Sequence, residues 1–375
     1  MKRFLALLLF LPAILLARPF EIPPPPLVEA KAWTLIDFNS NQVIASHDDN
    51  LRIEPASLTK LMTAYIVFGA LHQKLVKPDQ TMPVSIHAWH AEGSRMFLLP
   101  GKPVTVNDLL HGMIVQSGND AAIALAEGIA GSEDAFVKMM NREAQRLGMK
   151  NTHFADATGL PNPEHYTTVH DLSILASALI RDYPEYYPLF SIKEYTWNSI
   201  TQPNRNRLLW LDPNVDGMKT GHTESAGYCL VASTRRGKRR LISVLVGAHS
   251  DTGRAMESQK LLNYALQYYD SVLLYAKGQA VTTLRVWKGK KNSLKAGFAQ
   301  DLYVTVPKGD ESGLKATVET RQPLVVPVMA GQQVGVVKVS LDGRKFGEYP
   351  LLALENVEPA NIFGRMWDSL KLLLN

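Results

Sequence analysis

The sequence predicts an α+β domain, with an antiparallel sheet and a helix cluster, followed by a small all-β sandwich and a terminal amphipathic helix. Strand patterns at 33–46 and 228–246 enclose a long run of helical patterns. From about residue 279 the pattern changes to short alternating apolar runs separated by Gly, Asp and Lys turns, which is typical of a β-sandwich. At the end of the chain, apolar residues fall on one face of a helix.

Length, charge and cysteine content limit the possible function classes. A chain of 375 residues with 46% hydrophobic and 20% charged residues is ordinary for about two globular domains. The net charge of +5 falls to +3 without Lys2 and Arg3, which is too little to favour nucleic acid as a partner. Cys229 is the only cysteine, so no internal disulfide can form, and we expect a small buried hydrophobe there.

Residues 1–17 have the pattern of a secretory signal peptide. Lys2 and Arg3 precede a 13-residue apolar stretch, and Ala17 suits cleavage. The stretch is shorter than the roughly 20 residues that a membrane-spanning helix needs. We therefore expect cleavage after Ala17, with an uncleaved anchor as the alternative. Residues 18–30 contain four consecutive prolines and are expected to form an extended linker.

The α+β domain is expected over residues 31–278. It opens with a hairpin whose turn lies at 39–41, and a buried helix is expected from Pro55 to Leu71. The remaining expected elements are two helical segments within 105–130 separated by a polar break at 116–120, a helix from Ser132 to Gly148, a helix capped by Thr168, strands 228–234 and 241–246, and a helix from about Thr252 to Tyr275.

Two further segments follow this domain. The β-rich domain is expected over residues 279–358, and we find no chemistry-bearing motif in it. The terminal segment, 359–375, places Trp, Phe, Leu and Met on one helical face and charged residues on the other. Such a helix at the end of an exported chain suggests an anchor on a membrane surface. The alternative is a terminal helix that docks on its own domain.

Ser57 and Lys60 form the first candidate site. Three residues apart on a helix, they lie on one face as neighbours. The serine hydroxyl would lie in the first turn, where free N–H groups favour developing negative charge. A serine with a lysine one turn away has the parts of an activated nucleophile, an attacking oxygen and an amine that takes its proton. Taken alone, the same spacing is more often a capping serine and a solvated lysine.

Two further polar islands lie at the edges of regular elements. Ser117 and Asn119 lie in the break between two helical segments, and Lys219-Thr220-Gly221 lies on or just before a strand. A second serine and a second lysine can relay a proton, and an asparagine can hold a substrate amide. A glycine at a strand edge lets a substrate backbone approach closely. Together the three islands supply what acyl transfer through serine requires.

These motifs resemble those of a known family. Ser57-x-x-Lys60, Ser117-x-Asn119 and Lys219-Thr220-Gly221, in this order, are the signatures of penicillin-binding proteins and serine β-lactamases. The flanking residues, 55–63, 116–121 and 215–223, are similar to those of the low-molecular-mass D-alanyl-D-alanine carboxypeptidases. The resemblance covers essentially the whole mature chain, including the β-rich domain, and favours the membrane anchor at residues 361–375.

The resemblance implies a role for each site residue. Ser57 would be the acylated nucleophile and Lys60 its general base. Ser117 and Lys219 would relay the proton to the departing D-alanine, while Asn119 would orient the substrate or Lys60. Thr220 and Gly221 would bind substrate along the strand. The backbone N–H groups of Ser57 and His222 would form the oxyanion hole, and Arg254 would pair with the terminal carboxylate, which a guanidinium grips bidentately.

The implied protein is a periplasmic serine carboxypeptidase attached to the outer face of the inner membrane. It would remove the last D-alanine from peptidoglycan stem pentapeptides and be inhibited by β-lactams. No cofactor is expected, and no metal, because the histidines lack supporting ligand spacing. The sequence does not indicate the oligomeric state, nor whether water or an amine accepts the acyl group.

Two other functions were weighed. A class A β-lactamase adds a glutamate for deacylation, followed three residues later by asparagine, and no glutamate between Asn119 and Lys219 has that neighbour. The β-rich domain and the terminal helix have no use in a free lactamase. The other alternative, a non-catalytic protein that binds the cell wall, is disfavoured because all the signature residues are intact. A related transpeptidase or endopeptidase stays open.

Overall fold

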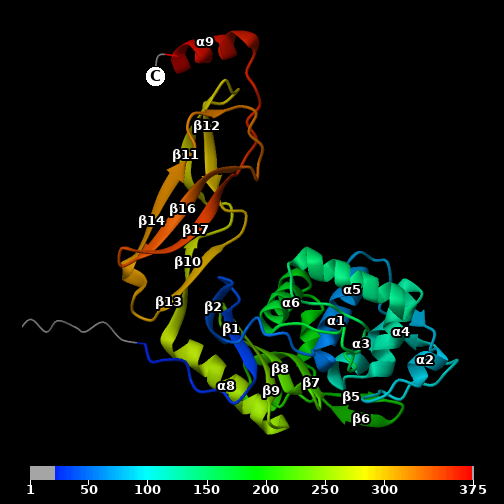
Figure 1. Ribbon diagram of the computed structural model, residues 1–375. Helices are drawn as coiled ribbons and strands as arrows, with labels where there is room; N and C mark the ends of the chain where they lie inside the picture. The colour runs from blue at the N-terminus through cyan, green and yellow to red at the C-terminus, as the bar shows by residue number, and fades with distance from the viewer. Residues whose placement is uncertain (1–21, 374–375) are drawn as a thin grey trace, which may run out of the picture.

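The computed structural model describes residues 22–373. The expected signal peptide and its cleavage after Ala17 lie outside these residues. The described chain forms two domains arranged as an L, and the terminal helix lies at the far end of the second domain (Figure 1).

An antiparallel five-stranded sheet is the centre of the first domain. Its order is β2-β1-β9-β8-β7, so strands from both ends of the domain pair directly. The strands are β1 (Ala32–Asp37), β2 (Gln42–His47), β7 (Val215–Thr223), β8 (Gly227–Arg236) and β9 (Arg239–Ala248). Because β7 ends the sheet, one edge of the strand that carries Lys219 is left without a strand neighbour.

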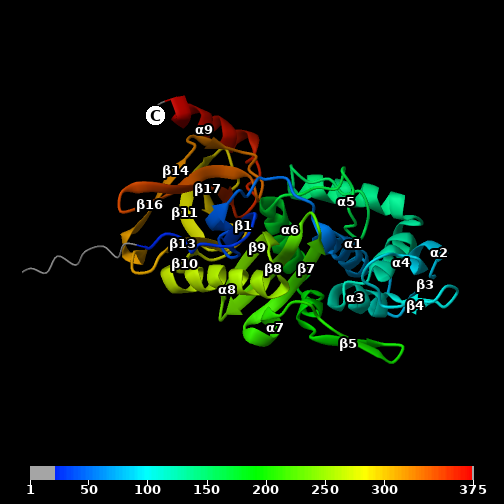
Figure 2. The same cartoon turned by 60° about the horizontal axis from the view of Figure 1, so that its bottom comes forward.

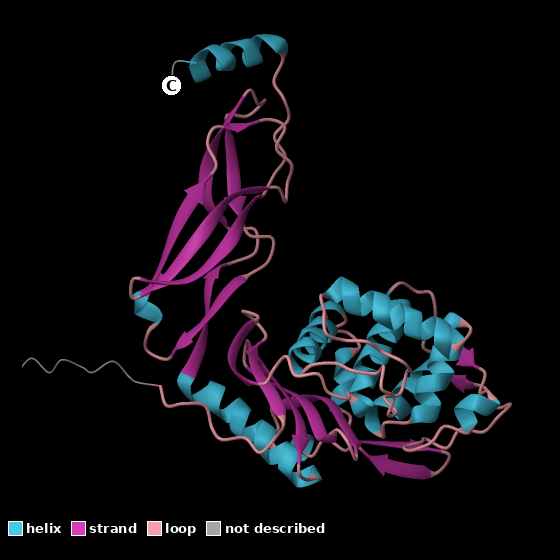
Figure 3. Ribbon diagram, in the orientation of Figure 1, coloured by secondary structure: helices cyan, strands magenta, loops and turns pink. Residues whose placement is uncertain are grey.

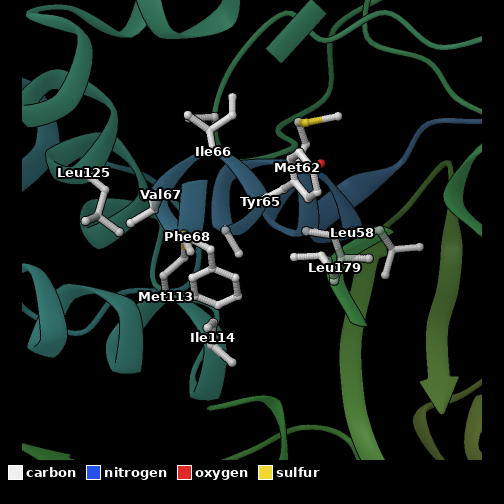
Figure 4. Close-up of a cluster of buried hydrophobic side chains, with 14 of the residues drawn as sticks. Leu58, Met62, Tyr65, Ile66, Val67, Phe68, Met113, Ile114, Leu125 and Leu179 are labelled. Atoms are coloured by element: carbon white, nitrogen blue, oxygen red, sulfur yellow. The ribbon is translucent and has the colours of Figure 1, made fainter. Parts of the chain in front are cut away.

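Helices cover both faces of this sheet (Figure 2). One face carries the helix cluster α1 (Lys60–His72), α2 (Ile86–Trp89), α3 (Val106–Val115), α4 (Asn119–Ala130), α5 (Glu133–Leu147) and α6 (Val169–Asp182). The other face carries α8 (Asp251–Tyr268), which packs on β8 and β9. Helix α1 is almost entirely buried at the centre of the cluster, where Phe68 packs near Met113 and Ile114 (Figure 4). Helix α1, which begins at Lys60, is therefore anchored along its length within the core.

Capping residues end the helices where the sequence predicts. Ser132 caps α5 by accepting from the Ala135 N–H, and Gly148 ends that helix in the left-handed region. Thr168 caps α6 by accepting from the Asp171 N–H. The hairpin of β1 and β2 and the two helical segments within 105–130 are confirmed as well, but the break between the segments spans only residues 116–118, because α4 begins at Asn119.

Two helix limits in the prediction are wrong. The helix expected from Pro55 begins only at Lys60, because Ala56 has a φ of 48° and the turn Ala56–Thr59 (η1) is a 3-10 helix. The helix expected to reach Tyr275 ends at Tyr268. The segment Tyr269–Tyr275 is strand β10, which pairs with β13 (Leu302–Pro307). Its aromatic and β-branched residues suit a strand once that partner is available.

Most of the second domain is a six-stranded sheet of order β14-β16-β17-β12-β11-β15 (Figure 3). Its strands are β11 (Ala280–Trp287), β12 (Ser293–Gly297), β14 (Leu314–Thr320), β15 (Leu324–Val325), β16 (Gln333–Leu341) and β17 (Arg344–Ala353). A separate apolar core, including Leu294, Val337 and Leu351, supports it. The pair of β10 and β13 joins this domain to the first, where Ser40 and Thr305 share a hydrogen bond of 2.7 Å.

Smaller elements complete the fold: β3 (Thr81–Met82), β4 (Val104–Thr105), β5 (Glu194–Trp197), β6 (Ile200–Pro203), α7 (Leu208–Leu211), and the 3-10 turns η2 (Tyr187–Ser191) and η3 (Glu311–Gly313). The last element is α9 (Ile362–Leu373), whose Ile362, Phe363, Met366 and Trp367 are exposed. None of the helices within residues 22–373 combines the length and apolar character that crossing a bilayer demands.

Candidate active site

The turn η1 places Ser57 directly before α1. The Nζ of Lys60, in the first turn of that helix, donates to Ser57 Oγ at 3.1 Å. Lys60 is only 1% exposed, although its charged form would prefer water. The expected juxtaposition of these two side chains is therefore present, on a 3-10 turn that leads into the buried helix.

Two oxygen atoms hold the Lys60 amine. It donates to Asn119 Oδ1 at 2.6 Å and to the backbone carbonyl of Thr158 at 2.7 Å. Burial, with a smaller contribution from Arg205, lowers the pKa of Lys60 to about 7, against the opposing effects of Asp156 and Asp120. A large fraction of Lys60 is therefore neutral near pH 7 and able to accept a proton.

A second serine and lysine pair faces the first. Ser117 lies between α3 and α4 with a φ of 64°, and Lys219 Nζ donates to its Oγ at 2.9 Å. Lys219 also donates to the Thr220 carbonyl at 3.0 Å. Burial, together with the nearby charges of Lys60, Arg205 and Arg254, holds the pKa of Lys219 well below its ordinary value. Two buried amines thus share one site, each with its own hydroxyl.

A loop that the sequence analysis missed fixes Asn119. The Asn119 side-chain amide donates to the Glu92 carbonyl at 2.6 Å, and its backbone N–H donates to the Ser94 carbonyl at 2.7 Å. The buried carboxylate of Asp120 accepts from the backbone of Met96 and Leu98. Loop 92–98 and the start of α4 therefore form one unit, and the Oδ1 of Asn119 is left to face Lys60.

The edge of β7 forms the opposite wall. A Cβ added to Gly221 would lie 3.3 Å from the Ser57 backbone nitrogen, so the strand and the turn η1 are in close contact. Arg254, at the start of α8, donates to the Gly221 carbonyl at 3.1 Å and forms an ion pair with Asp251. His222 is exposed, with its ring 4.1 Å from that of Tyr228.

These walls enclose a cavity of about 440 Å³. It is lined by Ser57, Gly93, Ser94, Ser117, Arg205, Thr220, Gly221, His222, Tyr228, Asp251 and Arg254. Six of the nine predicted site residues line it directly. The other three lie behind this lining: Lys60 and Lys219 each donate to one of the two serines, and Asn119 accepts from Lys60. All nine are brought together in one place.

Several lining residues were not predicted. Arg205 and Asp251 are surface charges by sequence, and nothing in their spacing separates them from other surface charges. Gly93, Ser94 and Tyr228 line the cavity because of the way their loop and strand fold. Among the described residues, no cluster of three or more His, Cys, Asp or Glu side chains could hold a metal ion.

Comparison with known proteins agrees with this geometry. The family profile described as D-alanyl-D-alanine carboxypeptidase, peptidase S11, matches residues 20–250. The chain belongs to the D-alanyl-D-alanine carboxypeptidase family. A second profile, the C-terminal domain of penicillin-binding protein 5, matches residues 269–359 of this family member, a range that begins with β10.

Curated family members are similar over most of their length. The carboxypeptidase DacC of Escherichia coli is 44% identical over 92% of this chain and 88% of its own. The carboxypeptidase DacA of Haemophilus influenzae is 42% identical over 93% of this chain and 90% of its own. The matches to residues 20–250 and 269–359 cover most of both domains and do not favour the lactamase or the non-catalytic alternative.

Solved structures of family members have the same fold. Penicillin-binding protein 5 from Haemophilus influenzae is 41% identical, with a TM-score of 0.85 over 90% of this chain and 99% of that one. Penicillin-binding protein D2 from Listeria monocytogenes, solved with ampicillin bound, is 29% identical, with a TM-score of 0.60 over 65% of this chain and 100% of that one. A β-lactam is therefore a ligand of that relative.

Proposed function

We propose that the chain is an exported serine carboxypeptidase that removes the terminal D-alanine from peptidoglycan stem pentapeptides. One observation carries the chemistry: a buried lysine amine lies 3.1 Å from a serine hydroxyl that lines the cavity. Burial lowers the pKa of this amine to about 7, which makes it a base at neutral pH. The family membership supplies the substrate class.

The acylation step uses both serine and lysine pairs. Ser57 Oγ attacks the carbonyl carbon of the penultimate D-alanine while Lys60 takes the hydroxyl proton. The resulting oxyanion would accept from the backbone N–H groups of Ser57 and His222. When the C–N bond breaks, the leaving amine takes a proton delivered through Ser117 and Lys219, and free D-alanine departs.

The cavity positions the substrate by its backbone and its carboxylate. An extended peptide can pair with the free edge of β7 beside Gly221, as an added strand. Thr220 and Arg254 are the proposed polar contacts, with Arg254 nearest the terminal carboxylate, while Asn119 would orient Lys60. Water then hydrolyses the acyl-enzyme. β-Lactams would enter the same cavity and acylate Ser57.

The remaining parts of the chain would place this site at the cell wall. We assign residues 1–17 to a signal peptide and 18–30 to a linker, with the catalytic domain at 31–278, the β-rich domain at 279–358 and β10 at their junction. Residues 359–375 would be the anchor, lying on the outer face of the inner membrane through the exposed side chains of α9.

The test is release of free D-alanine from an acyl-D-Ala-D-Ala peptide by the purified chain and by Ser57→Ala. We expect release by the wild type and none by the variant. Release that persists in Ser57→Ala would contradict the mechanism. A folded wild type that releases no D-alanine would favour an amine acceptor or a wall-binding role instead.

A further inference from the structure

A carboxylate and an imidazole lie directly behind the proposed base, and the mechanism above does not use them. Asp156 and His165 belong to the connection between α5 and α6, and neither lines the cavity among the described residues. His165 is 2% exposed. Asp156 is partly buried, with 22% of its side chain exposed, and such a pair is costly to bury unless its polar atoms are hydrogen-bonded.

Asp156 organises the backbone that holds Lys60. Its Oδ1 accepts from the backbone N–H groups of Thr158 and Gly159, both at 2.6 Å, and from the Thr158 hydroxyl at 2.8 Å. These three bonds fix the Thr158 peptide, whose carbonyl accepts from Lys60 Nζ at 2.7 Å. The peptide group between Thr158 and Gly159 therefore links the Asp156 carboxylate to the Lys60 amine: its N–H donates to Asp156 and its carbonyl accepts from Lys60.

His165 ties this loop to the nucleophile turn. Its Nδ1 lies 3.4 Å from Asp156 Oδ2, and its Nε2 lies 3.0 Å from Thr59 Oγ1. Because a carboxylate only accepts, Nδ1 donates to Asp156, and in the neutral tautomer that this bond selects, Nε2 accepts from the Thr59 hydroxyl. Thr59 directly precedes Lys60, so the imidazole joins the two segments between which the amine lies.

Close packing shows that the loop and the turn form one unit. Gly159 has a φ of 91°, and a Cβ at this position would lie 1.7 Å from the Ala56 carbonyl oxygen and 2.8 Å from Thr59 Oγ1. The loop backbone is thus seated directly on the residue before Ser57. A displacement of one segment must move the other.

We propose that Asp156 and His165 are positioning residues for the Lys60 amine, Asp156 by fixing the Thr158 carbonyl on Nζ and His165 by fastening that loop to the Ser57 turn. This inference rests on the proposed role of Lys60. A misplacement of about 1 Å at a reacting group costs on the order of a hundredfold in rate, so loosening this support slows acylation without removing any reacting group.

The experiment measures the rate at which a fluorescent penicillin acylates the full chain, with the labelled fraction at completion as a second readout. We expect Asp156→Ala and His165→Gln to slow acylation about tenfold or more while the labelled fraction stays complete. His153→Gln is the matched control. His153 lies in the same connection, with its Nδ1 on the Glu164 carbonyl and no hydrogen bond to Thr59 or Asp156 among the described residues.

The Asp156→Asn variant tests the hydrogen bonds that Asp156 makes to the loop separately from the effect of its charge on Lys60. The asparagine Oδ1 keeps the acceptor for Thr158 and Gly159, so most of the lost rate is expected to return. The charged groups that act on Lys60 are Asp156 and Asp120, which raise its pKa, and Arg205, which lowers it, while Lys219 lies beside it. Without the Asp156 charge, the acid limb of the pH–rate profile is expected to move to lower pH.

The outcomes separate this inference from the proposed function. If the wild type is not labelled, or Ser57→Ala is labelled equally, the proposed function fails. If the wild type is labelled but Asp156→Ala and His165→Gln react as fast as His153→Gln, the positioning role is overturned. A reduced labelled fraction with an unchanged rate in the labelled part would also overturn it, because that result describes unfolding alone.

Discussion

Gly221 and Ser57 lie in contact where strand β7 meets the turn η1: a Cβ added to the glycine would lie 3.3 Å from the serine backbone nitrogen. The same Cβ would lie 3.2 Å from the Ala56 side chain, so an added methyl group would meet the turn at more than one point. A strand edge and a nucleophile turn this close leave no space for a side chain at residue 221 unless one of the two segments moves.

Gly221→Ala is therefore expected to reduce kcat/KM for D-alanine release by about tenfold, because the added methyl displaces the Ser57 N–H from its position. The loss should appear mainly in kcat, with Tm close to that of the wild type. Activity equal to wild type would show that the contact between β7 and the Ser57 turn is looser than the structure has it.

The pH dependence of acylation should report Lys60. Burial lowers the pKa of this amine to about 7, and only the neutral amine accepts the Ser57 proton. The second-order rate of acylation by penicillin is expected to fall about tenfold for each pH unit below that value and to level off above it. Lys60→Arg, which stays charged, should be inactive throughout. A flat profile between about pH 5 and pH 9 would contradict Lys60 as the base.

Arg254 should matter only for substrates with a free carboxylate. It is 4% exposed and lines the cavity beside the Gly221 carbonyl. Arg254→Ala is expected to lower kcat/KM about tenfold or more for acyl-D-Ala-D-Ala, and much less for the C-terminal amide of the same peptide. The matched control is Arg207→Ala, because Arg207 also pairs with Asp251 but does not line the cavity. Equal losses on both peptides would assign Arg254 a purely structural role.

The exposed face of α9 should control membrane binding. Phe363 and Met366 are 83% and 66% exposed, and each would contribute about 1.5–3 kcal/mol on burial in the bilayer interface. Phe363→Glu with Met366→Glu is expected to release the chain from sedimenting lipid vesicles while D-alanine release from a soluble peptide stays unchanged. Ser369→Glu, which adds a charge on the polar side of the helix, is the control. Continued sedimentation of the double variant would show that α9 is not the anchor.

The sequence was informative where chemistry depends on side-chain type and spacing. Ser57 and Lys60 are predictable because residues three apart in a helical segment lie next to each other. Lys219 and Gly221 are predictable because they belong to a short motif. The contact between Lys60 and the Thr158 carbonyl was not predictable, because every residue has a carbonyl and only the folded loop selects this one.

The other differences between the prediction and the structure come from contacts between segments that are distant in the sequence. Segment 269–275 continues the helical pattern of α8, yet it becomes β10 because β13, about thirty residues later, offers an antiparallel partner. Arg205 lines the cavity because Asn204 and Asn206 fix the backbone on either side of it, and Asn206 reaches the Gly217 carbonyl at 3.0 Å. Such contacts join residues whose types alone carry no signal.

The free edge of β7 also bears on the tendency of the protein to associate with itself. An unpaired strand edge is a template on which any extended chain can grow, including a strand from a second copy, and such growth leads to aggregation. Here the turn η1 packs against β7 at Gly221, so a strand from another folded protein would have to fit beside that turn in order to pair with this edge. The packing that fixes the Ser57 turn thereby also restricts which chains can extend the sheet at this edge.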